Sequence, residues 1–126
     1  MTPTIPAADH QGPTPRGLFS SLLADLLKST GRTEEARQVL ELGMKLGEVE
    51  SMIPLGNLYC ELGDDDAAEQ AYRAGADSGD PHSHHNLAVL LADRDDPVGA
   101  EMHFRLAIQG GDTLAATALR ELLEDQ

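Results

Sequence analysis

Aromatic and basic residues are scarce in this chain. Tryptophan is absent, and aromatic residues make up only 3% of the sequence, which leaves few stacking platforms for bases or sugars. Nine lysines and arginines stand against 22 aspartates and glutamates, and the net charge is −13. Because such a charge repels phosphate backbones and anionic lipid surfaces, we expect no nucleic-acid and no membrane partner. The acidity either attracts basic segments or simply keeps a bacterial-type acidic surface soluble.

Long apolar runs and paired cysteines are also missing. No stretch approaches the roughly 20 apolar residues that a membrane span needs, and Cys60 is the only cysteine, which excludes an internal disulfide. Residues 1–16 lack the basic start and apolar core of a secretion signal and contain four of the seven prolines. We therefore expect a disordered, proline-rich tail over residues 1–16 and a cytoplasmic protein.

What the chain does contain is a period of 32 residues. Three registers of mostly leucine recur at this spacing, together with one register of alanines and one of glycines. They are Leu23, Leu55, Leu87 and Leu119; Leu26, Leu58, Leu90 and Leu122; Leu27, Tyr59, Leu91 and Leu123; Ala36, Ala68 and Ala100; and Gly47, Gly79 and Gly111. A fixed period over most of the length indicates one small unit that is copied and stacked.

Each unit has the apolar spacing of two helices. Leu55, Leu58 and Tyr59 follow the i, i+3, i+4 pattern of a first helix, which we name A, and a second stripe that includes Ala68 and Tyr72 marks a helix B. Aspartate followed by proline, at residues 80–81 and 96–97, predicts a helix start. The recurring glycine after each B helix predicts its end. Pro54 predicts a kink in the second A helix or a delayed start near Ser51.

These patterns predict an all-α fold, a right-handed solenoid of three antiparallel A/B helix pairs and a C-terminal capping helix. We expect one domain over residues 17–126, with units at about 17–48, 49–80 and 81–112 and a cap at 113–126. The cap should close the core with its leucines. Its charged residues Arg120, Glu121, Glu124 and Asp125 should face water, as terminal repeats require.

Residues of the second unit carry a family resemblance. Leu55-Gly56-x-x-Tyr59, with Gly63, Ala68 and Tyr72 after it, resembles the tetratricopeptide repeat, although the period is shorter than the family's usual 34 residues. The linker at residues 74–80, followed by Asn86-Leu87-Ala88, is similar to the related Sel-one-like repeat. Both resemblances imply a non-catalytic adaptor whose A helices line a concave groove that binds a peptide or a partner's helix.

The resemblance also implies which side chains would line that groove. The candidates for partner binding are Asp25, Lys28, Ile53, Asn57, Cys60, His82, His85, Val89 and Glu121. Asn57 matches a position that chaperone-binding members use to hold a peptide. Because Lys28 is the only cation among these residues, a clamp for a terminal carboxylate is incomplete, and we expect a neutral or basic protein segment. The alternative is self-association through Leu18 and Phe19, which have no preceding repeat to cover them.

Residues that could carry chemistry are few. His82, His84 and His85 crowd one helix start, where His82 and His85 with Cys60 could bind a metal, could tune partner binding with pH, or could simply be solvated. A Cys60–His85 nucleophile pair is a further alternative. Catalytic and nucleotide-binding motifs are absent from the sequence, and the acidic run at residues 64–66 is typical of a helix cap. We expect no enzyme activity, no cofactor and no metal.

Overall fold

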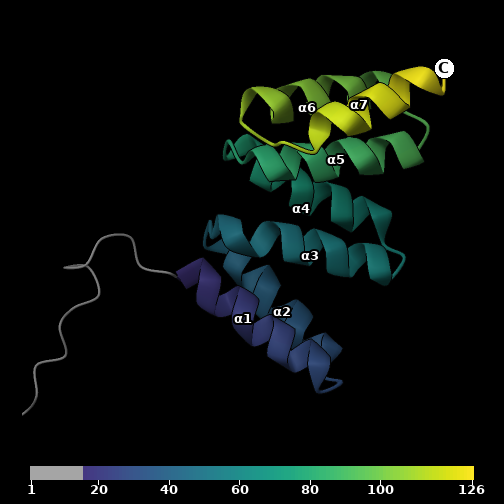
Figure 1. The fold of residues 1–126 in the computed structure, drawn as a ribbon. Helices are drawn as coiled ribbons and strands as arrows, with labels where there is room; N and C mark the ends of the chain where they lie inside the picture. The colour runs from purple at the N-terminus through teal and green to yellow at the C-terminus, as the bar shows by residue number, and fades with distance from the viewer. Residues whose placement is uncertain (1–15) are drawn as a thin grey trace, which may run out of the picture.

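The computed structural model describes residues 16–126, and this part of the chain folds into seven helices without a strand (Figure 1). The helices are α1 (Arg16–Ser29), α2 (Thr33–Lys45), α3 (Val49–Glu61), α4 (Asp65–Asp77), α5 (Pro81–Asp93), α6 (Pro97–Gln109) and α7 (Ala115–Glu124). The predicted tail lies outside the described residues except for Arg16, which already begins α1.

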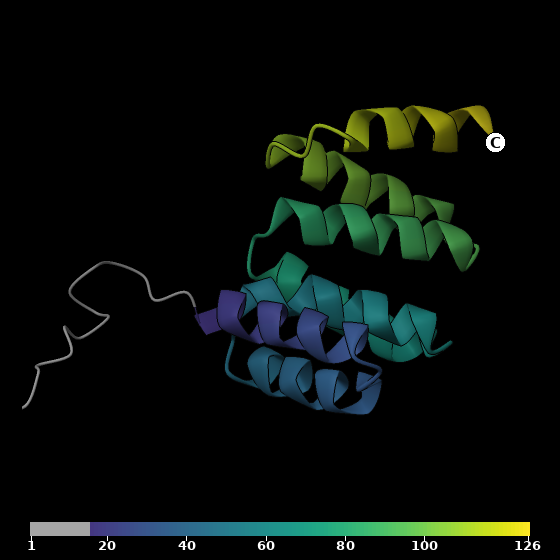
Figure 2. The same cartoon turned by 60° about the horizontal axis from the view of Figure 1, so that its bottom comes forward.

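The helices stack in two layers. The A helices α1, α3, α5 and α7 form one layer and the B helices α2, α4 and α6 form the other, as the two views of Figures 1 and 2 show. Each helix packs on the next along the chain, and α3 also packs on α1 and α5. The predicted solenoid of three helix pairs and a capping helix is therefore confirmed.

The turns between helices follow the predicted chemistry. Gly47, Gly79 and Gly111 end the B helices with φ values of 77°, 86° and 98°, which only glycine adopts without a Cβ penalty. Asp80 and Asp96 cap α5 and α6, each accepting a hydrogen bond from a backbone N–H three residues later. The aspartate–proline signal thus predicts both helix starts correctly.

Small residues let neighbouring helices approach closely. A Cβ on Gly43 would lie 2.3 Å from the Ser51 hydroxyl oxygen, and a Cβ on Gly75 would lie 2.0 Å from that of Ser83. A Cβ on Gly56 would lie 2.3 Å from the ring of Tyr72. The two glycine–serine contacts recur because B helices meet the next A helix at the same register, whereas Gly56 and Tyr72 join the two helices of one unit.

The core follows the leucine registers from the second unit onwards. Leu55 and Leu87 are 0% exposed. The equivalent Leu23 is 46% exposed because no described helix precedes α1. Two details of the sequence predictions are wrong. Of the two alternatives for Pro54, a kink or a delayed start near Ser51, the delayed start is excluded, because α3 begins at Val49 and runs through Pro54. Leu123 is 44% exposed and does not close the core.

Candidate functional site

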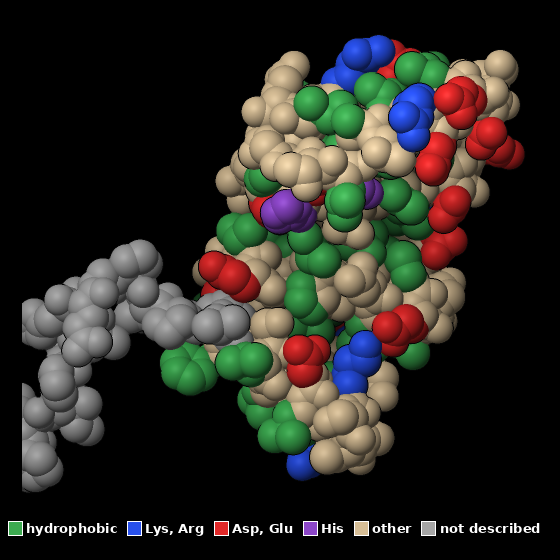
Figure 3. Space-filling model, viewed as in Figure 1, with side chains coloured by type: hydrophobic (Ala, Val, Ile, Leu, Met, Phe, Trp, Pro, Cys, Tyr) green, Lys and Arg blue, Asp and Glu red, His purple; other side chains and the backbone are tan. Residues whose placement is uncertain are grey.

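The exposed surface of α1, α3, α5 and α7, which we call the A-helix face, is the candidate binding site. Figure 3 shows hydrophobic side chains over the middle of this face and acidic side chains along one edge, where the A helices end. Two pockets open on the face, one between α1 and α3 and one between α5 and α7. A protein surface with one polar and one apolar pocket beside a charged edge is suited to binding a peptide.

The α1–α3 pocket has a volume of about 200 Å³ and is mostly polar. Its lining residues are Ser21, Ala24, Asp25, Lys28, Leu40, Pro54, Asn57 and Glu61. The ammonium group of Lys28 lies 3.1 Å from a carboxylate oxygen of Glu61, so the pocket's cation is already paired. Because both side chains are partly exposed, this ion pair contributes little to the stability of the fold. It does occupy space in the pocket and neutralise its lysine.

The side chain of Asn57 is held by Tyr72 of α4. The hydroxyl of Tyr72 donates to the side-chain oxygen of Asn57, and the sulfur of Cys60 lies 3.9 Å from the same hydroxyl. Burial raises the pKa of Tyr72 and Cys60 raises it further, so the phenol stays protonated as a donor. The amide nitrogen of Asn57, an exposed residue, therefore remains available to a partner's carbonyl group.

The α5–α7 pocket has a volume of about 210 Å³. Its lining residues are Val89, Ala92, Asp93, Phe104, Ala118, Glu121, Leu122 and Asp125. Phe104 is 3% exposed and forms part of the floor, whereas Val89 is 41% exposed. An apolar floor bounded by three carboxylates suits an apolar side chain next to a basic one.

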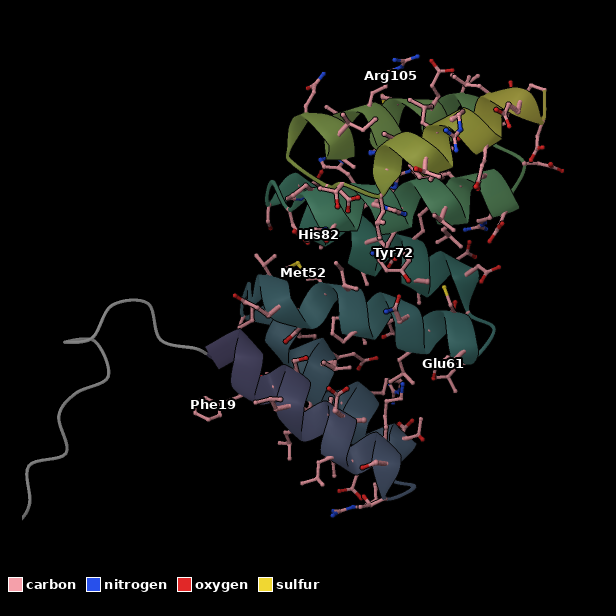
Figure 4. The ribbon with its side chains drawn as sticks, in the orientation of Figure 1. Phe19, Met52, Glu61, Tyr72, His82 and Arg105 are labelled. Carbon is pink, nitrogen blue, oxygen red and sulfur yellow. The ribbon has the colours of Figure 1, made fainter. Side chains whose placement is uncertain are left out.

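Acidic side chains line both pockets at the same edge of the stack, and we define the acidic rim as Glu61, Asp93, Glu121 and Asp125. These residues lie at or near the carboxyl ends of α3, α5 and α7. Figure 4 shows Glu61 at this edge of the stack. Because helix carboxyl ends carry partial negative charge, the backbone adds to the negative field of the side chains.

Two of the three clustered histidines, His82 and His85, meet at Asp112. The Nδ1 atoms of His82 and His85 lie 2.8 Å and 3.0 Å from the two carboxylate oxygens of Asp112. Asp112 also accepts hydrogen bonds from the backbone N–H groups of Leu114 and Ala115, before α7. Burial would raise the pKa of Asp112, but the hydrogen bonds from His85, His82 and Leu114 outweigh it and lower the pKa to about 2.

A second histidine pair lies between α5 and α6. The Nδ1 atoms of His84 and His103 are 2.9 Å apart, and the two rings stack with centroids 5.2 Å apart. Burial lowers the pKa of His103, and His84 and Arg73 lower it further. The lowered pKa of His103 favours its neutral form within this stacked pair.

The structure thus groups the predicted residues in three places. Asp25, Lys28 and Asn57 lie in the α1–α3 pocket, and Val89 and Glu121 lie in the α5–α7 pocket. His82 and His85 bind Asp112. Ile53 is half-buried on α3, and Cys60 is exposed with Tyr72 as its polar neighbour.

Sequence reasoning missed Pro54, Glu61, Asp93 and Asp125 as pocket residues. The signal for the last three was the acidic end that recurs on each later A helix. Sequence reasoning also missed Asp112 as the partner of the histidines, because these contacts span 27 and 30 residues and leave no local pattern.

In the described part of the chain, the residues predicted as candidates for metal binding or thiol chemistry do not all come together. Residues 16–126 contain no group of three histidine, cysteine, aspartate or glutamate side chains placed to hold a metal ion. Within the same residues Cys60 makes no hydrogen bond to His85, whose Nδ1 binds Asp112 instead. None of the described helices is long and apolar enough to cross a membrane.

Comparisons with known proteins agree with this architecture. Residues 21–46 and residues 81–105 each match a family model described as tetratricopeptide repeat. No curated protein matches the chain. Among solved structures, the chain is similar to the type III secretion translocator chaperone SycD of Yersinia enterocolitica, with a TM-score of 0.70 and 21% sequence identity. The match covers 84% of this chain and 82% of that one, and at this identity it shows a shared fold.

Proposed function

Since this chain is built of tetratricopeptide-type repeats, we propose that it is a protein-binding adaptor that holds a peptide or a partner's helix against its A-helix face. The observation that carries the proposal is the pair of pockets on that face, which lie on either side of its middle and contain five of the predicted contact residues. The proposed action is binding without catalysis.

The charge of the A-helix face supports a basic or neutral partner segment. Three carboxylates of the acidic rim line the α5–α7 pocket, and the fourth, Glu61, lines the α1–α3 pocket and holds Lys28. A terminal carboxylate of a bound peptide would meet this rim without a set of free cations to hold it. Lysine or arginine side chains of a partner would instead gain favourable contacts and a faster encounter.

The size of the pockets supports short anchor side chains. Volumes of about 200 Å³ and 210 Å³ admit one side chain each, a polar one between α1 and α3 and an apolar one between α5 and α7. Both volumes lie below the range of pockets that enclose a whole small molecule. Two partner side chains in shallow pockets bury a limited surface area, so we expect a dissociation constant in the micromolar range for the complex. Asn57 would fix the backbone of the segment through its exposed amide group.

The proposal can be tested with a displayed library of random peptides selected against the full chain. We expect selected peptides to share apolar anchors and basic residues. The double variant Asp93→Lys with Glu121→Lys reverses two charges of the rim without removing a side-chain hydrogen bond. It should weaken basic peptides roughly tenfold and enrich acidic ones.

A matched control changes the same charge elsewhere. Asp77→Lys with Glu101→Lys alters two acidic residues of the B helices α4 and α6, which line neither pocket of the A-helix face. The control should keep the wild-type peptide preference. Equal loss of binding in both double variants would show that net charge, and not the A-helix face, selects the peptide.

A further inference from the structure

The first helix pair exposes a strip of large apolar side chains on the outer end of the stack. We define this N-terminal strip as Phe19, Leu22, Leu23 and Leu26 of α1 with Leu42 and Leu46 of α2. Their exposed fractions lie between 46% for Leu23 and 68% for Phe19. Figure 4 shows Phe19 pointing outwards from α1, away from α3. Contiguous apolar surface of this kind marks an interaction site.

The strip lies where the interior units have a covering helix. Leu55 and Leu58 stand one period after Leu23 and Leu26, and they are 0% exposed. In the next unit Leu87 and Leu90 are also buried, and there α5 packs against α4 of the preceding pair. The exposed strip is therefore the surface that a preceding helix pair would otherwise cover.

The strip nevertheless differs from an ordinary repeat surface. Ser51 stands one period after Phe19, and Ser78 stands one period after Leu46. Ser51 contacts Gly43 so closely that even a Cβ on that glycine would lie 2.3 Å from its hydroxyl oxygen. Phe19 in that position prevents another repeat from stacking at the same short distance. A different covering arrangement is required.

The tail of the same chain is poorly suited to cover the strip. Residues 1–15 contain Met1 and Ile5 as their large apolar side chains, and four prolines separate the remaining polar and small residues. Six large apolar side chains therefore face a segment with two. A second copy of the strip, by contrast, offers a matching number of apolar side chains.

The distribution of charge along the chain also favours a second copy as the partner of the N-terminal strip. Residues 16–48 carry five basic and five acidic side chains, whereas residues 49–126 carry four basic and sixteen acidic ones. Two copies of this acidic chain repel each other over most of their surface, but the first helix pair has no net charge. It is the part of the described chain on which two copies can meet at the lowest electrostatic cost.

We propose that the N-terminal strip is the interface of a homodimer in which the first helix pairs of two copies pack on each other about a two-fold axis. Such an interface is self-complementary and closes at two copies. A hollow of about 430 Å³ beside the strip, lined by Leu23, Leu27, Val39 and Leu42 among others, can receive apolar side chains of the second copy. The residues of α1 that line the A-helix face, Ser21, Asp25 and Lys28, are not part of the strip. The dimer therefore presents two binding faces, which strengthens the binding of partners with two segments.

Sedimentation velocity of the full chain over about two orders of magnitude in protein concentration tests the proposal. We expect a monomer–dimer equilibrium that shifts towards dimer as salt rises, because salt screens the repulsion between the acidic bodies. The double variant Leu22→Glu with Leu26→Glu places charges on the strip and should sediment as a monomer throughout. Its helical circular dichroism should match wild type, since both leucines are more than half exposed.

A matched variant adds the same charges at the other end of the stack. Val98→Glu with Met102→Glu changes two exposed side chains of α6 and should leave the dimer intact. Loss of the dimer in this variant, growth into larger oligomers with concentration, or a wild-type monomer at every concentration would each overturn the proposal. If the strip variant fails to fold, Phe19→Glu alone provides the second test, with the same expected loss of dimer.

Discussion

At the scale of single residues, two serines one period apart have different surroundings. Ser83 is buried, and its hydroxyl donates to the carboxylate of Asp80 at 2.7 Å. Ser51 is equally buried, but its hydroxyl oxygen has no hydrogen-bond partner. The difference arises because Glu48, which replaces Asp80 in this unit, accepts instead from Ser20 of α1.

We predict that Ser51→Ala stabilises the protein. The change removes a buried hydroxyl that lacks a partner, which costs about 1–3 kcal/mol, while the alanine fits beside Gly43. Ser83→Ala is the control, and it should lower the free energy of unfolding by about 1 kcal/mol because it removes a made hydrogen bond. Urea unfolding of the three proteins measures both changes. Destabilisation of similar size in the two variants would contradict this reading of Ser51.

Asp112 gives a residue-scale prediction for pH. Its pKa of about 2 lies below the ordinary value of 3.8, so its ionised form is favoured in the folded state. The stability that it contributes is present above pH 4 and is lost as the pH falls towards 2. Asp112→Asn should therefore destabilise the protein at neutral pH, and the difference from wild type should shrink between pH 4 and pH 2. Thermal unfolding across this range checks the prediction, and a constant difference would refute it.

At the scale of helices, Pro54 is the local exception. It lies inside α3, where a proline removes one backbone hydrogen bond and costs about 3 kcal/mol relative to alanine. Its side chain lines the α1–α3 pocket.

We predict that Pro54→Ala raises the free energy of unfolding by about 1–3 kcal/mol, because the carbonyl of Glu50 regains a donor within the helix. Chemical denaturation of variant and wild type measures the gain. A useful control is Pro81→Ala, since Pro81 occupies the first position of α5, where a proline is favourable. That control should be neutral or slightly destabilising. A loss of stability in Pro54→Ala would show that the ring itself contributes necessary packing.

The helix boundaries show which parts of the structure the sequence predicts. Local signals suffice for helix ends: Asp80 and Asp96 with their prolines, and the glycine after each B helix, predict boundaries that the structure confirms. Local signals do not predict the partner of a side chain when that partner lies far away in the sequence. Glu48 has the position of a cap but binds Ser20, 28 residues earlier, and Asp112 joins histidines of another helix. Only the fold reveals these partners.

At the scale of the whole molecule, the period predicts the stack but not its surfaces. The registers place Leu23 and Leu55 in equivalent positions, although one is exposed and the other buried, because a terminal unit lacks a neighbour. The candidate site follows similarly: the family resemblance supplies Asn57 and Val89, whereas the acidic rim emerges only when the ends of three A helices lie together. Stacking, which no single unit encodes, creates the candidate binding face.

An adaptor of the proposed kind should bind its partners across the A-helix face. Amide chemical-shift mapping of the isotope-labelled full chain, titrated with the best basic peptide from the displayed library, tests it most directly. We expect the shifts to concentrate on exposed residues of α1, α3, α5 and α7 around the two pockets, and to weaken in Asp93→Lys with Glu121→Lys. Shifts confined to the B helices or to the N-terminal strip would contradict it.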